Sequence, residues 1–322
     1  MKNNANYKTT ADKEWICEPA ALARQSLWES DKRQVRFFRS LLGQIIMAVW
    51  LFCILRGFLG WLLIERGVLT PLVNNGTIPT DFITPIDAYS TIVIIAGYII
   101  YMRFAERRSF PAMGFIRKNW LLRYLAGLCL GFLAFSIVVL ISAALSGGNI
   151  VYQGTITPGM FLFVLGGWVI QGMAEEVGYR GYMFLSISRK HKMYIGMICS
   201  SLFFGVTHAF NSGATVLSVV NTMLFGFAFC LLFIVSENIW FAGAFHTAWN
   251  LAQGNIFGIS VSGHEVSPSI FAVQIPEGNQ ILSGGTYGIE ANIITTFITL
   301  GIIIVSLLII RKRKQTAAAA GC

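Results

Sequence analysis

The sequence predicts an all-α fold: a polytopic transmembrane helical bundle of about eight spans, with both termini in the cytoplasm. Of the 322 residues, 55% are hydrophobic and only 12% are charged, which is far more apolar than a typical soluble domain. Several apolar runs reach about 18–20 residues, the length at which a helix crosses a bilayer. An outer-membrane barrel would instead show short alternating segments. The composition therefore predicts a multi-pass protein of the cell membrane.

The apolar segments divide the chain into eight expected spans. They cover about residues 41–63, 87–105, 121–145, 159–188, 193–210, 214–235, 238–257 and 292–310. Residues 1–39 form an N-terminal arm whose mixture of Trp, Phe, Leu and basic residues suits a helix lying on the inner leaflet, although a solvated arm is equally compatible. We expect the transmembrane bundle to cover residues 40–310, followed by a basic cytoplasmic tail at 311–322.

Basic residues occur in alternate connections between these spans. They lie in the N-terminal arm, in "RFAERRSF" after the second span, in "SRKHK" after the fourth, and in "RKRK" after the eighth. The positive-inside rule places these segments, and both termini, in the cytoplasm. The net charge of +9 is thus interpreted as anchoring at the lipid bilayer, and no nucleic-acid partner is expected.

Polar side chains lie deep in three of the expected spans. The candidates are Glu175, Glu176, Arg180, His208, His246 and Asn250. With a rise of ~1.5 Å per residue, Glu175 and Asn250 lie roughly 20 Å from the cytoplasmic ends of their helices. On the same basis His208 lies roughly 24 Å and His246 roughly 14 Å deep. Separate helices therefore bring polar groups to a common level, where ionisable residues usually have a function.

Helical phase separates these candidates into two groups. Glu176 and Arg180 are four residues apart, in the favourable order for an ion pair that neutralises both charges in low dielectric. Glu175 points about 100° away, and we expect it to have no partner on its own helix.

The remaining candidates share helix faces. Phe204 lies on the same face as His208, and His246 on the same face as Asn250. We expect a small wet cavity lined by Glu175, His208, His246 and Asn250, with the ion pair behind it as a brace.

Such a cavity suits activation of a water molecule. A desolvated glutamate can act as a general base, and a neighbouring histidine can share the proton. A second histidine and an asparagine can hydrogen-bond the oxyanion of a tetrahedral intermediate. No cofactor is expected, but Glu175, His208 and His246 are also of the types that bind Zn²⁺ as an open three-ligand site.

The three motifs together resemble a known family. "EEVGYR" (175–180), "FGVTH" (204–208) and "HTAWN" (246–250) occur in order on successive helices, which is similar to the CAAX-protease and bacteriocin-processing (CPBP, or Abi) family with its Rce1-type prenyl-protein endopeptidases. The similar core covers about residues 110–290, and "SGGTYGIEAN" (283–292) looks like the glycine-rich segment of bacterial members.

The resemblance implies an intramembrane glutamate-type endopeptidase that acts on a membrane-associated peptide or protein. Glu175 with His208 would activate water, His246 with Asn250 would stabilise the oxyanion, and Glu176, Arg180 and Phe204 would support them. Two alternatives stay open. One is a non-catalytic bacteriocin-immunity or scaffold protein of the same family, and the other is a proton-coupled transporter, because intramembrane Glu and His suit a proton relay.

Overall fold

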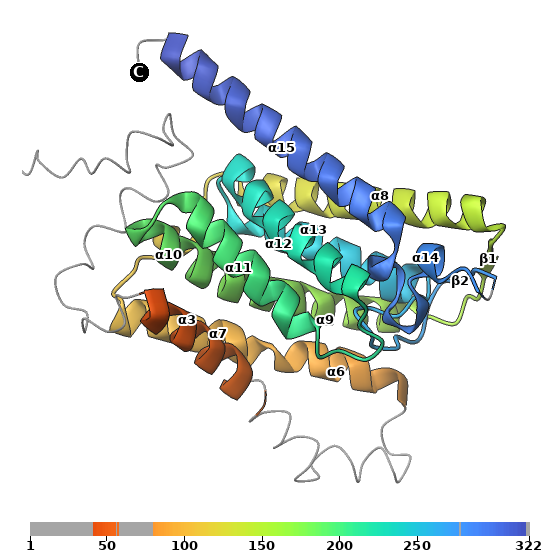
Figure 1. The fold of residues 1–322 in the computed structure, drawn as a ribbon. Helices are drawn as coiled ribbons and strands as arrows, with labels where there is room; N and C mark the ends of the chain where they lie inside the picture. The colour runs from red at the N-terminus through yellow and green to blue at the C-terminus, as the bar shows by residue number, and fades with distance from the viewer. Residues whose placement is uncertain (1–40, 56, 58–79, 277, 320–322) are drawn as a thin grey trace, which may run out of the picture.

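The computed structural model describes residues 41–55, 57, 80–276 and 278–319 (Figure 1). The expected N-terminal arm (1–39) and the end of the first expected span after residue 57 lie outside the described residues. Helices dominate the described part, and each of the eight expected spans contains at least one of them.

The helical elements follow one another in chain order. The N-terminal part contains α3 (Leu41–Val49) with the π-helical η1 (Trp50–Ile54), η3 (Thr80–Phe82), α6 (Ile83–Ser90), α7 (Ile92–Ile100), η4 (Tyr101–Ala105), η5 (Pro111–Met113) and α8 (Trp120–Ser146). The central part contains α9 (Pro158–Glu176), η6 (Val177–Phe184), α10 (Leu185–Lys190), α11 (Met193–His208), α12 (Val216–Ser236), α13 (Ile239–Leu251) and η7 (Ala252–Ile256). The C-terminal part contains α14 (Gln280–Ser283), η8 (Gly285–Tyr287), η9 (Ile289–Ala291) and α15 (Ile293–Ala319).

Five helical stretches of the described chain are long and apolar enough to cross a membrane. They are Ile83–Ala105, Trp120–Ser146, Pro158–Arg189, Val216–Ser236 and Ile293–Thr316. The apolar helix Met193–His208 is shorter, with 16 residues. Together these helices indicate a multi-pass membrane protein, because a helix of about 20 apolar residues spans the hydrocarbon core.

The prediction of an all-α chain needs one correction. Strands β1 (Asn149–Tyr152) and β2 (Phe271–Gln274) form a two-stranded antiparallel sheet in which Asn149 pairs with Gln274 and Tyr152 with Phe271. The expected spans leave the segment between residues 257 and 292 as a connection without regular structure. Part of this segment pairs instead with the connection between α8 and α9, a contact over more than a hundred positions that sequence periodicity does not show. Helix α15 also continues to Ala319, beyond the expected end of the bundle at residue 310.

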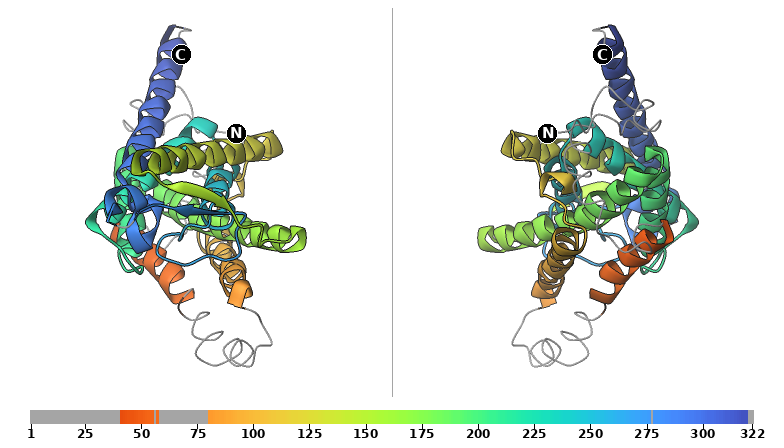
Figure 2. Two further views of the ribbon diagram at one scale, coloured as in Figure 1. Left: turned by 90° about the vertical axis from the view of Figure 1, so that its right-hand side faces the viewer. Right: turned by 90° about the vertical axis from the view of Figure 1, so that its left-hand side faces the viewer.

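Helix α13 lies at the centre of the bundle. It packs against α8, α9 and α12 (Figures 1 and 2), and every residue from 242 to 255 is buried. A helix surrounded on all sides must satisfy its polar groups internally. Thr247 accordingly donates to the Trp168 carbonyl oxygen at 3.2 Å, and Trp168 Nε1 donates to Asn255 Oδ1 at 2.7 Å. The two remaining deep polar groups of α13, His246 and Asn250, belong to the candidate site.

Side-chain caps define where three of the helices that bear site residues begin, whereas α11, which carries His208, has no side-chain cap. Thr157 accepts from the Met160 N–H at 3.2 Å at the start of α9. Thr215 and Ser218 form a reciprocal capping box on α12, and Asn238 accepts from the Trp240 N–H at 3.1 Å on α13. Each cap satisfies an orphan backbone donor, so the start of each helix is encoded locally.

Two glycines let α8 approach the central helix closely. A Cβ atom at Gly127 would lie 2.3 Å from the Phe241 carbonyl oxygen, and one at Gly131 would lie 2.4 Å from the Phe245 carbonyl oxygen. Glycines four residues apart allow two membrane helices to bring their backbones together. The contact at Phe245 therefore helps to fix the height of the neighbouring His246.

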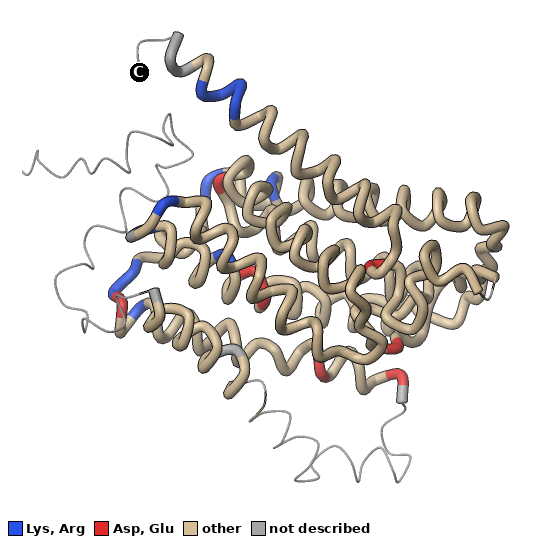
Figure 3. Tube along the Cα trace, in the orientation of Figure 1, with Lys and Arg blue, Asp and Glu red and all other residues tan. Residues whose placement is uncertain are grey.

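Charged residues are segregated along the bundle. Figure 3 shows that Lys and Arg gather mainly at one end of the described helices, and that the charged residues at the opposite end are acidic. This arrangement matches the alternation of basic connections in the sequence.

Gly131→Ala tests the close approach of α8 to α13. The added methyl group must displace backbone, and overpacking of this kind costs about 1–3 kcal/mol. We expect a clearly lower unfolding temperature in detergent micelles. Gly301→Ala is the matched control, because nothing lies within 4 Å of a Cβ at that position of α15. Equal stability of the two variants would contradict the close contact between α8 and α13 at Gly131.

Candidate active site

A buried ion pair forms the base of the site. Glu176 Oε1 accepts from Arg180 Nη1 at 2.9 Å, and neither side chain is exposed, which confirms the expected pair. The Arg180 guanidinium carbon lies 4.7 Å from the ring centroids of both Phe204 and Phe229. These two cation–π contacts and the apolar enclosure make the Arg180 charge dependent on its carboxylate partner Glu176.

Glu176 also holds a histidine of the central helix. Its Oε1 lies 3.1 Å from His246 Nδ1, and an ionised carboxylate can only accept, so Nδ1 is the donor. The His246 ring stacks on Phe229 with centroids 4.8 Å apart and an interplanar angle of 23°. The carboxylate and the aromatic ring together set the orientation of the imidazole. The other ring nitrogen, Nε2, faces Glu175 and lies 3.7 Å from its Oε2. Glu176 thus contacts the site directly instead of standing behind it.

Glu175 has a partner on its own helix, so that expectation is wrong. Gln171, four residues earlier on α9, donates from Nε2 to Glu175 Oε1 at 2.7 Å. The same amide accepts through Oε1 from Asn250 Nδ2 at 2.9 Å. Gln171 therefore joins α9 to α13. The available signal in the sequence is a neutral amide four residues before Glu175, where a helix places the two side chains on one face.

The second oxygen of Glu175 has no hydrogen-bond partner in the described part of the chain, although it is buried. His246 Nε2 lies 3.7 Å from this oxygen, which is longer than a hydrogen bond. A buried carboxylate oxygen without a donor is unfavourable for stability, and Glu176 Oε2 is in the same situation, so each of the two adjacent carboxylates has one oxygen that the described residues leave without a donor.

His208 is held by the backbone of its own helix. Its Nδ1 lies 2.8 Å from the Phe204 carbonyl oxygen, and its ring centroid lies 4.5 Å from that of Phe204. Because a carbonyl oxygen can only accept, Nδ1 carries the hydrogen and Nε2 of a neutral ring is the acceptor. The F-x-x-x-H spacing thus has two structural effects: it fixes the orientation of the His208 imidazole and places the Phe204 ring against Arg180.

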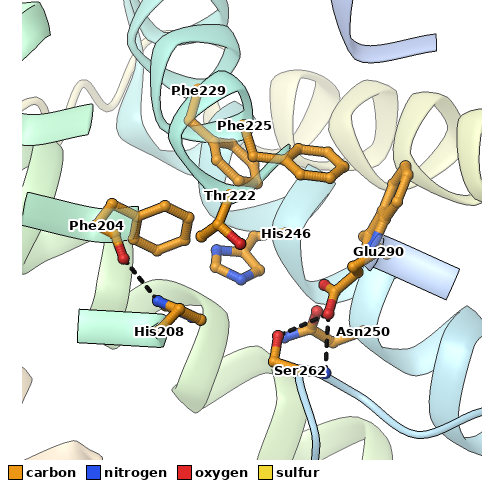
Figure 4. A pocket seen from close by; sticks show the side chains of 10 residues that line it. Phe204, His208, Thr222, Phe225, Phe229, His246, Asn250, Ser262 and Glu290 are labelled. Atoms are coloured by element: carbon orange, nitrogen blue, oxygen red, sulfur yellow. Dashed lines mark hydrogen bonds between the residues drawn. The ribbon is translucent and has the colours of Figure 1, made fainter. Parts of the chain in front are cut away.

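Three of the four expected residues line a small cavity (Figure 4). Its volume is about 20 Å³, and a single water needs roughly 10–15 Å³ on the same measure. The lining side chains are Phe204, His208, Thr222, Phe225, Phe229, His246, Trp249, Asn250, Ser262 and Glu290. Glu175 is not among them, contrary to expectation, since its carboxylate is turned to Gln171 and lies one side chain away, beside His246.

The lining includes a carboxylate that the sequence reasoning did not identify. Glu290 comes from η9, far along the chain, and lies with Asn250 and Ser262 to one side of His246 in Figure 4. Its motif, "SGGTYGIEAN", was noted only for its glycines. Phe229 was also missed, because one phenylalanine in an apolar span carries no distinguishing signal.

Irregular helix geometry accompanies the site. The π-helical η6 begins directly after Glu176, and the π-helical η7 begins two residues after Asn250. Single turns of this kind are frequent at functional sites, because the extra residue per turn changes side-chain phase.

The residues considered for zinc do not form a metal site. Within the part of the chain that the structure describes, no three His, Cys, Asp or Glu side chains are grouped so that they could hold a metal ion. Glu175 and His246 are close, whereas His208 is bonded to the backbone of α11.

The fold and the site define a helical membrane protein with a buried carboxylate–histidine cluster. Comparison with protein families shows more. Residues 156–252 match the model described as Rce1-like, type II CAAX prenyl endopeptidase. The chain therefore carries a domain of this CAAX endopeptidase family, and membership implies a membrane protease. A comparison with curated proteins found no significant match.

The matched region is narrower than the expected core of about 110–290. It contains Gln171 and all the expected site residues, from Glu175 to Asn250, whereas Ser262 and Glu290 lie beyond it.

Glu176→Gln tests the buried ion pair. The substitution removes the charge that compensates Arg180, and loss of one partner of a buried pair costs about 3–5 kcal/mol. We expect a large drop in the free energy of unfolding, measured by chemical denaturation in micelles. Glu237→Gln is the control, because the Glu237–Arg313 pair at 3.6 Å is about one-third exposed or more on both sides and exposed pairs contribute about 0–1 kcal/mol. Comparable small losses in both variants would overturn the structural role given to Glu176.

Proposed function

We propose that this protein is an intramembrane glutamate-type endopeptidase that hydrolyses a peptide bond in a membrane-associated peptide. The observation that carries the proposal is the buried Glu175–Glu176–His246 cluster beside a water-sized cavity, inside a CAAX endopeptidase domain. A protease family implies a protein or peptide substrate, and a lipidated or leader peptide fits an active site among membrane helices.

In this proposal Glu175 and His208 activate water. No hydrogen bond joins these two described residues, so the mechanism requires the attacking water to contact both, with Glu175 reaching it from beside His246. Glu175 Oε2 has no other hydrogen-bond partner among described residues, and His208 Nε2 is an acceptor. The water loses a proton to this pair as its oxygen attacks the carbonyl carbon. When the C–N bond breaks, the proton passes to the leaving amine.

His246 and Asn250 stabilise the oxyanion formed by that attack. A protonated His246 would keep Nδ1–H on Glu176 and present Nε2–H to the oxyanion. Asn250 uses one amide hydrogen for Gln171, and its second hydrogen is available. Both donors are carried by the fully buried part of α13, so they are preorganised for a charge that develops only in the transition state.

The membrane arrangement supports the same function. We propose eight spans in the cell membrane, with both termini on the cytoplasmic side. Gathering of Lys and Arg at one end of the described helices supports this orientation. Reporter fusions at both ends should give cytoplasmic signals, and a periplasmic or extracellular signal from one end would require an odd number of spans.

Cleavage assays in proteoliposomes test the reaction. The probes are a farnesylated peptide ending in Cys-a-a-X and matched acylated peptides that lack the prenyl group. Glu175→Gln and His208→Ala should each lower kcat/KM by about 10²–10⁴, the usual contribution of general base catalysis. His191→Ala, in the connection after α10, should cleave like the wild type.

Two outcomes would oppose the mechanism. Equal cleavage by Glu175→Gln and the wild type removes the proposed base. Protection or partner binding that survives Glu175→Gln, with no cleavage by the wild type, would favour the non-catalytic immunity or scaffold protein. Flux coupled to a pH gradient would favour the transporter.

Gln171→Met tests whether the amide aligns the two halves of the site. It removes the hydrogen bonds to both Glu175 and Asn250, and misplacement of reacting groups by about 1 Å can lower the rate by about 10²-fold. We expect kcat to fall while KM changes little. Gln274→Met, on the exposed end of β2, is the matched control. An unchanged kcat for Gln171→Met would show that the bridge does not position the reacting groups.

A further inference from the structure

Glu290 is a buried carboxylate at the cavity that the proposed mechanism does not use. It is only 8% exposed and lines the same cavity as His208, His246 and Asn250 (Figure 4). It lies outside the region that matches the endopeptidase family, which ends at residue 252. The family match itself therefore assigns no role to Glu290.

The backbone around Glu290 is built to hold it in place. Gly288 has φ +100°, and a Cβ there would lie 2.0 Å from the Ser260 carbonyl oxygen, so only glycine fits. Asn221 of α12 donates from Nδ2 to the carbonyl oxygens of Glu290 at 2.7 Å and Asn292 at 2.8 Å. Asn221 thus joins the backbone of the glycine-rich segment, at Glu290 and at Asn292, to helix α12.

The two oxygens of the Glu290 carboxylate differ. Oε2 accepts from the Ser262 N–H at 2.8 Å and from Ser262 Oγ at 2.7 Å. Ser262 itself has φ +47°, and its carbonyl oxygen accepts from Asn211 Nδ2 at 2.9 Å. Oε1 has no hydrogen-bond or ion-pair partner among the residues that the structure describes. One oxygen is anchored, and the other is available to a ligand.

The charge balance of the site favours a cation. Glu175, Glu176 and Glu290 are all buried, and Arg180 is the buried guanidinium among them. Three carboxyl groups thus lie near one guanidinium, and that guanidinium is paired with Glu176, so Glu290 has no guanidinium or ammonium partner among the described residues. A buried carboxylate without a counter-charge attracts a cation strongly, because the low dielectric of the interior screens the attraction between the two charges less than water does.

We propose that Glu290 determines specificity by binding an ammonium group of the substrate close to the cleaved bond. This inference rests on the proposed function. An ammonium carries up to three donors, so it can meet Oε1 of Glu290 on the side of the cavity that Glu290, Asn250 and Ser262 line, away from His208 in Figure 4. The ammonium can belong to a lysine side chain or to a free amino terminus. A carboxylate at the same place would be repelled.

Peptide binding to the uncleaving Glu175→Gln protein in neutral-lipid nanodiscs tests the inference. The probes are fluorescent acylated peptides in which Lys or Gln stands at one position at a time, together with a pair whose amino terminus is free or acetylated. A charge-assisted hydrogen bond corresponds to about a tenfold or greater preference. We expect this preference for Lys at one position, or for the free amino terminus, and its loss when Glu290→Gln is added.

Matched variants separate recognition from folding. Glu290→Gln can still accept from Ser262, and Glu290→Asp keeps the charge, so the ammonium preference should survive only in the latter. Glu265→Gln makes the same charge change at an exposed position of the same loop and should leave the preference intact. Affinities for neutral peptides should be equal in all variants.

Several results would overturn the inference. A preference that persists in Glu290→Gln, no preference at any position, or an equal loss for neutral and cationic peptides would each exclude recognition by Glu290. Because the readout is binding, it does not depend on cleavage. If the wild type cleaves no probe but the ammonium preference follows Glu290, the proposed function fails while the cation site stands.

Discussion

The carboxylate of Glu176 is the constraint on which the rest of the site depends. It is shared by Arg180 at 2.9 Å and His246 at 3.1 Å, in an environment without exposure to solvent. Moving such charges out of water is unfavourable by several kcal/mol per ion unless each finds its partner. The positions of α9, η6 and α13 relative to one another are therefore coupled: a shift of any one of them would leave a buried charge unpaired. The aromatic rings of Phe204 and Phe229 enclose the pair and extend this coupling to α11 and α12.

This division of roles explains why two adjacent glutamates occur in a membrane helix. Glu176 is paired with Arg180 and His246 through one oxygen, whereas Glu175 has no arginine partner and lies 3.7 Å from His246 Nε2; each carboxylate keeps a second buried oxygen that no described group satisfies. Gln171 fixes the orientation of Glu175 through its other oxygen and ties it to Asn250. Neighbouring residues on one helix can thus serve stability and chemistry separately, because successive side chains point about 100° apart.

Much of the site could be predicted from local sequence rules. The i,i+4 spacing of Glu176 and Arg180 and the apolar runs are short-range patterns that depend on helix geometry alone. The contacts of Gln171 with Glu175 and Asn250 could not be predicted from charge patterns, because the Gln171 side chain is neutral. Glu290, Ser262 and the β1–β2 sheet could not be predicted in the same way, because their contacts join segments far apart in the chain. Such contacts depend on how the connections between helices fold over the bundle, and helical periodicity carries no information about that.

The most direct test is the stability of Glu175→Gln compared with Glu176→Gln, measured by thermal unfolding in the same lipid. Gln at 175 can still accept from Gln171 and removes a buried charge that has no close cationic partner except His246, so its unfolding temperature should equal or exceed that of the wild type. Gln at 176 should be much less stable. If both substitutions destabilise the protein equally, Glu175 is a structural residue like its neighbour, and the separation of roles at this site is wrong.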